Sequence, residues 1–292
     1  PLRARFALEP LLPGCLAQGI VIGARKGRVL PGAHVAQVAG YIHDLVVAEQ
    51  DVNRSARGAR LALEPHEQVE HAPRVGPAVD EVAEAYKTAG VRHIVALRGD
   101  PSAGAGTSYS PHPGGYANAA DLVGGLKRIG NFDISVAGYP EKHPDSRSVA
   151  EDLDNLKAKV DAGASRVITQ FFFDNAHFLR FLEAARAHGI WAPIIPGIVP
   201  IHNFKQVAGF AGRCGASIPS WLARRFDGLD DDTQTTHLVA AAMAAEQVMD
   251  LVDQGIRQFH FYTLNRADLV YAICHLLGLR PEPAAESKVV TA

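Results

Sequence analysis

Short apolar runs alternate with amphipathic helical stretches from residue 79 onward. The apolar runs are six or seven residues long and show no polar face, which is typical of strands buried on both sides. Helical periodicity fills residues 79–90, 148–163 and 175–189, and each stretch ends in Gly, a common residue after a helix C-terminus. The predicted strands occupy residues 93–98, 134–139, 166–172, 193–199 and 259–264.

This alternation predicts parallel strands joined by right-handed crossovers. A (β/α)8 TIM barrel and a doubly wound open sheet both fit the pattern. We favour the α/β barrel because polar residues follow nearly every predicted strand, and in a barrel all strand ends converge on one rim. The length of 292 residues is normal for one barrel. We therefore predict a single domain over residues 1–292, with a C-terminal tail at 281–292.

The first 78 residues follow neither period. They are rich in Arg, Gly, Pro and Ala, and the first three βα units that a barrel needs there are not recognisable. Within this segment, residues 19–24 are predicted as a strand and residues 41–52 as a helix. The recognisable βα units span residues 79–280, which makes residues 1–78 an atypical N-terminal segment.

Composition narrows the class of protein. Lys and Arg number 29 against 31 Asp and Glu, without a basic stripe for nucleic acid. The sequence lacks the run of about 18 apolar residues that a membrane span needs. Three cysteines (Cys15, Cys214 and Cys274) lie far apart, which argues against disulfides and structural zinc. Without a secretory signal pattern, we expect a cytoplasmic globular protein.

Polar and aromatic residues gather at the predicted strand ends. They are aromatics, amides, cations and a carboxylate, without the clustered His, Asp and Glu of a metal site. The sequence also lacks a GxSxG motif or a Cys–His pairing that would indicate a nucleophile. Such a lining suits a flat, polar, conjugated ligand. The strand ends carry Arg98-Gly99-Asp100, Tyr139 to His143, Gln170, His202-Asn203, and Tyr262 to Arg266.

Seven segments in order resemble the bacterial methylenetetrahydrofolate reductases: "HIVALRGDP", "GGYANAADLV", "DISVAGYPEKHP", "DLDNLKAKVDAGASRVITQFFFD", "IIPGIVP", "FDGLDDD" and "FHFYTLNRADLVYAICHLLG". The resemblance covers about residues 79–280. It implies a flavoprotein barrel that reduces 5,10-methylenetetrahydrofolate to 5-methyltetrahydrofolate with NAD(P)H, by ping-pong hydride transfer through FAD. That oxidoreductase would serve one-carbon metabolism and methionine biosynthesis. Family members are commonly oligomeric, which leaves a homo-oligomer open.

The resemblance also implies a set of site residues. Asp100 and Phe226 match catalytic positions, and an anion at Asp100 would make reduced flavin a better hydride donor. Ala158 stands where the family often has a basic residue. The matched substrate positions are Gln170, Phe226, Tyr262 and Arg266. The matched FAD positions are Arg98, Gly99, Asp100, Tyr116, Ala117, Tyr139, His143, Asp152, Asn155 and Lys159.

Ordinary structural roles compete with several of these assignments. Arg98 and Asp100 could form a surface ion pair, and His143 could be a solvated loop histidine. Asp152, Asn155 and Lys159 share one helix face at spacings of three and four, as on a solvated helix surface. Phe226 could pack in the core at a helix end. Gln170 ends a buried strand, and the cost of burying an unpaired amide favours a ligand role.

The catalytic Glu of the family has no match. In the family the first strand carries "FEFFPP", whose Glu is the general acid for ring opening, and the next two carry "SVTYG" and "HLTC". None of these occurs in residues 1–78. The alternative is therefore a catalytically impaired or inactive member, either an FAD- or folate-binding remnant or a frame-disrupted product.

A metal-dependent barrel using His143, His202 and His260 is a further alternative. His260 alternates with Phe259 and Phe261 within a predicted strand, which favours packing over ligation.

Overall fold

Strands and helices alternate along the part of the chain that the computed structural model describes: residues 20–22, 45–48, 75–88, 90–98, 110–111, 115–263 and 267–279. The chain divides into two units. The central unit comprises Asp44–Ile195 and Gly209–Ser217. The C-terminal unit comprises Pro1–His43, Pro196–Ala208 and Ile218–Ala292.

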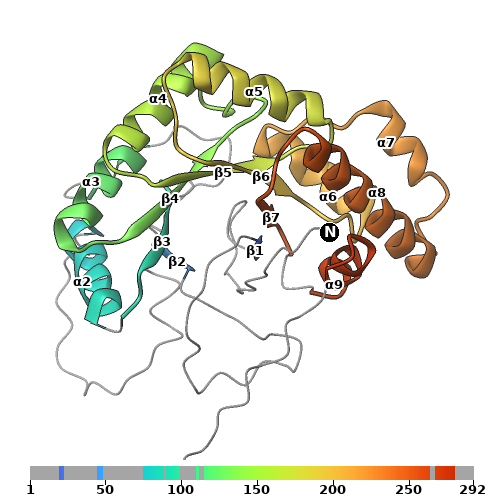
Figure 1. Ribbon diagram of the computed structural model, residues 1–292, viewed down its shortest axis with the longest axis horizontal. Helices are drawn as coiled ribbons and strands as arrows, with labels where there is room; N and C mark the ends of the chain where they lie inside the picture. Colours follow the sequence, from blue (N-terminus) through green and yellow to red (C-terminus); the bar gives the residue numbers. More distant parts are fainter. Residues whose placement is uncertain are drawn as a thin grey trace, which may run out of the picture. The chain divides into compact units, whose positions relative to one another are not determined.

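The central unit contains a parallel sheet flanked by helices. Its strands pair in the order in which they follow along the chain. In Figure 1 the helices line the outer side of these strands. The strands are β2 (Leu45–Ala48), β3 (His93–Ala96), β4 (Asp133–Gly138) and β5 (Arg166–Phe171), and the helices are α2 (Val75–Thr88), α3 (Ala119–Ile129), α4 (Val149–Asp161) and α5 (Asn175–Ala187).

Side-chain caps set where three of these helices begin. The side chains of Asn118, Ser148 and Asp174 precede α3, α4 and α5, and each accepts a hydrogen bond from a backbone N–H of the first turn. Such caps satisfy donors that the helix itself leaves unpaired. At the other end, Gly163 and Gly189 take φ values of +116° and +76° shortly after α4 and α5. Left-handed backbone of this kind favours Gly, which confirms the predicted helix ends.

β3, β4 and β5 of the central unit are almost entirely buried, as predicted for strands that are covered on both faces. In β4 and β5 every residue after the first is buried. Beyond β5, the ring of Phe172 stacks on that of Phe178 from α5, with centroids 5.4 Å apart. Phe171 meets Phe210 edge-on at 5.5 Å. This aromatic cluster fixes the end of β5, where the predicted site residue Gln170 lies.

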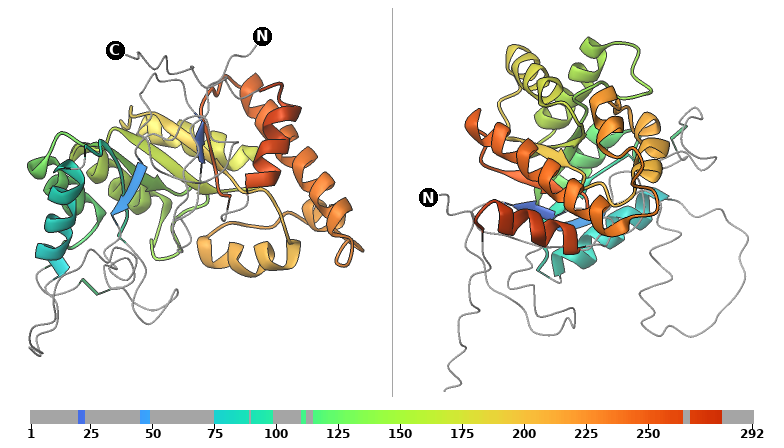
Figure 2. Two further views of the ribbon diagram at one scale, coloured as in Figure 1. Left: turned by 90° about the horizontal axis from the view of Figure 1, so that it is seen from below. Right: turned by 90° about the vertical axis from the view of Figure 1, so that its right-hand side faces the viewer.

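The C-terminal unit holds the remaining strands. β6 (Ile194–Ile198) begins in the central unit and ends here, and its last residues pair in parallel with β7 (Phe259–Phe261). β7 also pairs with β1 (Ile20–Ile22). Figure 2 shows the long α8 beside α9, and the two helices pack together. The helices are α6 (Phe204–Ala211), α7 (Ser220–Arg225), α8 (Thr233–Asp253) and α9 (Ala267–Leu276). The last residues of α6, from Gly209, and the 3-10 turn η1 (Gly212–Cys214) belong to the central unit.

The repeated unit of parallel strand and outer helix is that of a (β/α)8 barrel, the fold class predicted from the sequence. The predicted strand at residues 19–24 is confirmed over β1. The helix predicted over residues 41–52 is wrong at Leu45–Ala48, which form β2. This apolar stretch contains two valines and pairs along its whole length with β3, and such pairing outweighs a weak helical pattern. β1 departs from the predicted parallel order because it runs antiparallel to β7.

Across the described residues, no helix combines the length and the apolar character needed to cross a membrane.

Candidate functional site

Three neighbouring strands of the central unit end on residues that the sequence marked as functional. Arg98 lies two residues beyond β3, Tyr139 directly follows β4, and Gln170 is the penultimate residue of β5. The carboxyl ends of parallel strands lie at one edge of a sheet, which is where barrel enzymes carry their catalytic groups. The strand order thus brings these three residues to the same edge.

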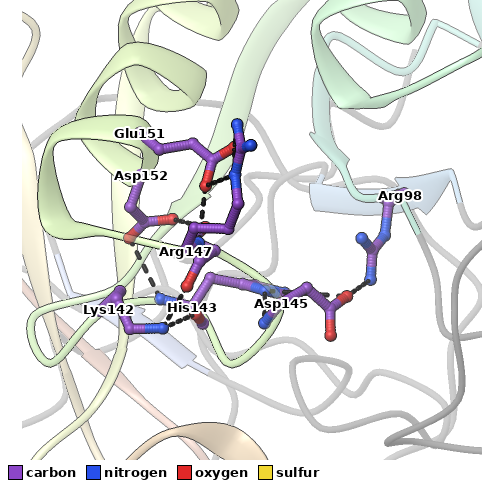
Figure 3. A network of polar contacts seen from close by, with 8 residues as sticks. Arg98, Lys142, His143, Asp145, Arg147, Glu151 and Asp152 are labelled. Carbon is purple, nitrogen blue, oxygen red and sulfur yellow. Dashed lines mark hydrogen bonds and ion pairs between the residues drawn. The ribbon is translucent and has the colours of Figure 1, made fainter.

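A polar network joins the end of β3 to residues 139–147, the β4 loop (Figure 3). Nη2 of Arg98 donates to Oδ2 of Asp145 at 2.9 Å. The backbone N–H of Asp145 donates to Nδ1 of His143 at 3.0 Å. The ring of His143 in turn meets that of Tyr139 edge-on, with centroids 4.5 Å apart. The structure therefore brings Arg98, Tyr139 and His143 together through Asp145, which the sequence did not mark.

Asp152, in the first turn of α4, anchors the β4 loop. One carboxylate oxygen accepts the backbone N–H of His143 at 3.2 Å, and the other accepts the hydroxyl of Ser146 at 2.9 Å (Figure 3). Both oxygens of this predicted FAD-binding residue thus have protein partners. Its observed contacts hold the loop that carries His143.

Further contacts inside the β4 loop fix its shape. Lys142 takes a φ of +78°, an unusual conformation for a residue with a side chain. Its ammonium group donates to the backbone carbonyls of His143, at 2.9 Å, and Ser146. Arg147 pairs with Glu151 of α4, with Nη2 2.8 Å from Oε1 (Figure 3). Lys142 therefore lies folded back on its own loop.

His143 is a neutral hydrogen-bond donor at pH 7. Burial lowers the pKa of its imidazole below the usual 6.5, and the nearby Arg98 cation lowers it further. Because Nδ1 accepts the N–H of Asp145, the ring proton of the neutral form sits on Nε2. Among the described residues, Nε2 has no hydrogen-bond partner. It is therefore available to a ligand oxygen.

Lys159 places a second cation close to this network. It lies in the last turn of α4, and its Nζ donates to the carbonyl oxygen of Ala137 in β4 at 2.6 Å. Burial lowers the pKa of this ammonium group to about 8, with Asp152 opposing the change and Arg98 adding to it. At pH 7 Lys159 is still largely protonated. Its low pKa shows that the charge is poorly solvated, so an anionic ligand would stabilise it.

Gln170 is almost fully buried at 3% exposure. Its side-chain oxygen accepts the backbone N–H of Phe171 at 2.9 Å. This contact fixes the orientation of the amide, and its NH2 group has no partner among the described residues. Two amide protons thus remain for an acceptor on a ligand, which agrees with the burial argument from the sequence.

Tyr116 and Ala117 lie away from this network in the described contacts. The Tyr116 hydroxyl donates to Oδ1 of Asp80 in α2 at 2.5 Å, and its ring covers Gly125 of α3. Burial and the Asp80 carboxylate raise the pKa of Tyr116 to about 12. The backbone N–H of Ala117 donates to Asp121 at 3.0 Å. These residues join two outer helices, and their predicted contact with flavin stays a prediction.

Asn155 and Ala158 are exposed on α4. Asn155 follows Asp152 by three residues and precedes Lys159 by four, as the predicted common helix face requires. Ala158 presents only a methyl group, so the cation that the family often carries there is missing from this helix.

Two predicted substrate residues lie in the C-terminal unit. Phe226 is buried at the end of α7 and stacks on Phe204, with centroids 5.3 Å apart and planes at 8°. Tyr262 follows β7, is buried, and meets His260 edge-on at 4.6 Å. Both have the packing role that competes with a ligand role. The predicted residues Gly99, Asp100 and Arg266 lie outside the described residues.

The three histidines of the alternative metal site do not form a described cluster. His260 is buried, and burial lowers the pKa of its imidazole to about 3. His202 packs edge-on against His237, with centroids 5.9 Å apart. In the described part of the chain, no group of three or more His, Cys, Asp or Glu residues could hold a metal ion.

The edge of the central unit thus offers two cations, a neutral imidazole donor and a buried amide. These groups suit a ligand with phosphate oxygens at one end and a heterocycle with hydrogen-bond acceptors at the other. Sequence reasoning missed Asp145 and Ser146. Their signal was the polar segment "EKHPDSRS" between a buried strand and a capped helix, a position that requires a hydrogen-bonded loop.

Comparison with known proteins identifies the family. The family model described as methylenetetrahydrofolate reductase matches residues 73–278. The 5,10-methylenetetrahydrofolate reductase of Pectobacterium carotovorum subsp. carotovorum is 52% identical over 206 residues, which cover 70% of this chain and 66% of that protein. The enzyme of the same name from Escherichia coli (strain K12) is 54% identical over 200 residues, which cover 68% and 65%. The chain thus matches just under two thirds of each relative's length.

Among solved structures, an uncharacterized protein from Clostridium thermocellum that binds two copies of 5-methyl-5,6,7,8-tetrahydrofolic acid aligns with a TM-score of 0.40 and 11% identity. The alignment covers 80% of this chain and 93% of that one. The family model, in contrast, matches more than half of the chain, and both bacterial relatives are more than half identical over the same region. The chain belongs to the methylenetetrahydrofolate reductase family.

Proposed function

We propose that the chain is a flavoprotein that reduces 5,10-methylenetetrahydrofolate to 5-methyltetrahydrofolate with NAD(P)H as donor. The observation that carries this proposal is the group of Arg98 beyond β3, His143 in the β4 loop and Lys159 of α4, in a chain of this family. Two cations and a neutral donor suit the phosphates of a dinucleotide better than they suit a neutral ligand. The names of the bacterial relatives support the same reaction.

The residues present fit FAD. Lys159 holds a poorly solvated positive charge that a phosphate would stabilise, and the Nε2–H of His143 would donate to a second oxygen. Arg98 and Tyr139 would border the flavin ring, with Asp152 holding the loop between them. When bound, FAD supplies a two-electron carrier that takes a hydride from NAD(P)H and gives it to the folate in alternating half-reactions. The other proposed FAD-binding residues are Gly99, Asp100, Tyr116, Ala117 and Asn155.

The substrate would lie against the remaining positions. The NH2 group of the buried Gln170 amide would donate hydrogen bonds to acceptors on the pterin ring. The aromatic ring of Phe226 would stack on either substrate, Tyr262 would contact the folate, and the Arg266 guanidinium would pair with the carboxylate tail of the folate. Asp100 would tune the hydride-donating strength of the reduced flavin. Cytoplasmic location and a homo-oligomer stay predictions from the sequence.

The second candidate is a member that binds these ligands and reacts slowly or not at all. It is favoured by the boundary of the family match at residue 73, since the family's general-acid Glu belongs to the first strand. General acid catalysis is commonly worth about 10²–10⁴-fold, so without that acid the reaction with folate would slow by this factor. Reduction of the flavin by NAD(P)H needs no such acid and would persist.

Visible absorbance of the purified full chain tests both candidates. A flavin spectrum that bleaches anaerobically with NADH or NADPH, and returns when methylenetetrahydrofolate is added, is the expected result. The faster of the two donors gives the nucleotide preference. Bleaching without return would favour the impaired member. A colourless protein that takes up no added FAD would contradict the proposal.

A further inference from the structure

We infer that Asp145 is a positioning residue of the flavin site, with its carboxylate holding Arg98 and its backbone N–H setting the tautomer of His143. The inference rests on the proposed function, since it assigns a role within the site proposed to bind FAD. Asp145 belongs to none of the positions that the family resemblance marks. Its role follows from the contacts of the β4 loop (Figure 3).

The first contact is the ion pair with Arg98. Nη2 of Arg98 and Oδ2 of Asp145 are 2.9 Å apart, while the two side chains are 26% and 43% exposed. Arg98 lies beyond the end of β3, and a long side chain in that position has many rotamers. Holding the guanidinium from the neighbouring loop removes part of this freedom before a ligand arrives. Asp145 thus lowers the entropy cost of binding a ligand through the Arg98 guanidinium.

The second contact is the hydrogen bond to His143. The N–H of Asp145 can only donate, so Nδ1 of His143 must be the unprotonated nitrogen. The opposite tautomer would put two N–H groups face to face at 3.0 Å. Oδ2 of Asp145 lies 3.9 Å from Nδ1, beyond hydrogen-bond distance, so the backbone N–H and not the carboxylate is the partner of that nitrogen. The result is an imidazole whose donor, Nε2–H, always faces away from Asp145.

The two contacts use different groups of Asp145, which can be changed separately. The contact with Arg98 needs the carboxylate charge, whereas the contact with His143 needs only the backbone. Asp145→Asn therefore weakens the first, because it replaces a charged acceptor by a neutral one, and keeps the second, whereas Asp145→Glu keeps the charge on a longer arm. Asp161→Asn is the matched control, because that carboxylate pairs with Lys157 at the far end of α4 and is 58% exposed.

The test is FAD affinity of the full chain, measured by quenching of flavin fluorescence, in a double-mutant cycle with Arg98→Met. We expect D145N to weaken binding about threefold to fivefold, the upper part of the range for a partly exposed ion pair. D145E should recover most of that loss, and D161N should bind as the wild type does. In the R98M background D145N should change the affinity by less than about twofold, because its effect acts through Arg98. A purely structural role would give equal effects in both backgrounds.

Nitrogen-15 spectra of histidine-labelled protein test the second contact without FAD. With His143 identified by comparison with His143→Gln, we expect a protonated Nε2 and an unprotonated Nδ1 in both wild type and D145N. The reverse tautomer, or D145N that binds FAD as tightly as the wild type, would overturn the inference while leaving the proposed function intact. A wild type that binds no FAD would refute the proposed function, and the tautomer alone would then decide whether Asp145 orients His143.

Discussion

The carboxylate of Glu141 accepts hydrogen bonds from both the backbone N–H and the hydroxyl of Ser217, a residue 76 positions further along the chain. The N–H lies 3.2 Å from each carboxylate oxygen. The Glu141 side chain is only 11% exposed, and Nε2 of His177 in α5 lies 3.6 Å from Oε2. Glu141 thereby ties the β4 loop to the segment 209–217 within the central unit.

Removing this carboxylate should loosen the end of segment 209–217. Hydrogen bonds to a charged group are worth about 1.5–3 kcal/mol, so Glu141→Ala should speed amide hydrogen exchange at Ser217 by about tenfold or more. Ser217→Ala is the control, since it removes the hydroxyl and keeps the N–H bond, and should have a smaller effect. Unchanged exchange at residue 217 in E141A would show that Glu141 does not hold the segment.

Asp133 should make stability depend on pH. At the start of β4 it binds Nδ1 of His93 at 2.9 Å and also contacts Ser165 and Arg166, which joins the starts of three strands. The hydrogen bond from His93 lowers the pKa of Asp133 most, Ser165 and Arg166 lower it further, and burial opposes them, for a net pKa below the usual 3.8. A carboxylate with a lowered folded pKa stabilises the protein above its unfolded value and loses that contribution as the pH falls below it.

We therefore expect Asp133→Asn to lower the free energy of unfolding by about 1–3 kcal/mol at pH 7. The difference from wild type should shrink steadily below about pH 4. Urea unfolding at pH 7, 5 and 3 measures it, with Asp161→Asn as an exposed carboxylate for comparison. A loss of stability of the same size at all three pH values would mean that packing, not charge, explains the effect.

Lys159 should make FAD binding weaken at alkaline pH. Burial lowers the pKa of its ammonium group to about 8, so the charge proposed to meet a phosphate is lost at a lower pH than usual. A charge-assisted hydrogen bond is worth about 1.5–3 kcal/mol, which corresponds to a fall in affinity of about tenfold or more by pH 9.5. Lys159→Arg keeps its charge over this range and should show a flatter profile. Wild type and K159R with the same pH profile would exclude Lys159 as the titrating group.

In the absence of FAD, the lowered pKa of Lys159 affects the free energy of unfolding in the opposite direction to FAD affinity. The folded chain releases the Lys159 proton near pH 8, whereas the unfolded chain keeps it to about pH 10.5. Between these values the unfolded state binds more protons, so the contribution of Lys159 to the free energy of unfolding rises with pH. Affinity and stability should therefore change in opposite directions, which separates a local charge effect from general unfolding.

The strands β3 to β7 and the helices α2, α4 and α5 were predictable because their signals are local. Buried parallel strands give continuous apolar runs, and Ser148, Asp174 and Asp232 precede helices that they cap. β2 was missed because its identity depends on pairing with β3, a contact far apart in the sequence. The antiparallel pairing of β1 was missed for the same reason.

The candidate site was predictable only in part. Gln170 stands out because a buried amide must find partners, whereas Arg98, His143 and Lys159 were expected only through the family resemblance. Asp145 could not be found in this way, because its role depends on which loop lies beside the end of β3. For Tyr116 the motif indicated flavin, whereas the described contacts place its hydroxyl on Asp80 of α2.

Substitution of two adjacent glycines in α3, Gly124 and Gly125, tests where the Tyr116 ring lies. A Cβ built on Gly125 would lie 2.1 Å from the Tyr116 hydroxyl, whereas one on Gly124 would meet, among the described residues, only Arg128, at 3.6 Å. Gly125→Ala should therefore force the Tyr116 ring away and cost about 1–3 kcal/mol of stability. Gly124→Ala should be neutral or stabilising by up to about 1 kcal/mol, since Ala favours helix. Thermal unfolding of both variants measures the difference. In a Tyr116→Ala background the cost of G125A should disappear. If both substitutions were equally tolerated in the wild type, the Tyr116 ring would not lie on α3 and would be free to meet the flavin.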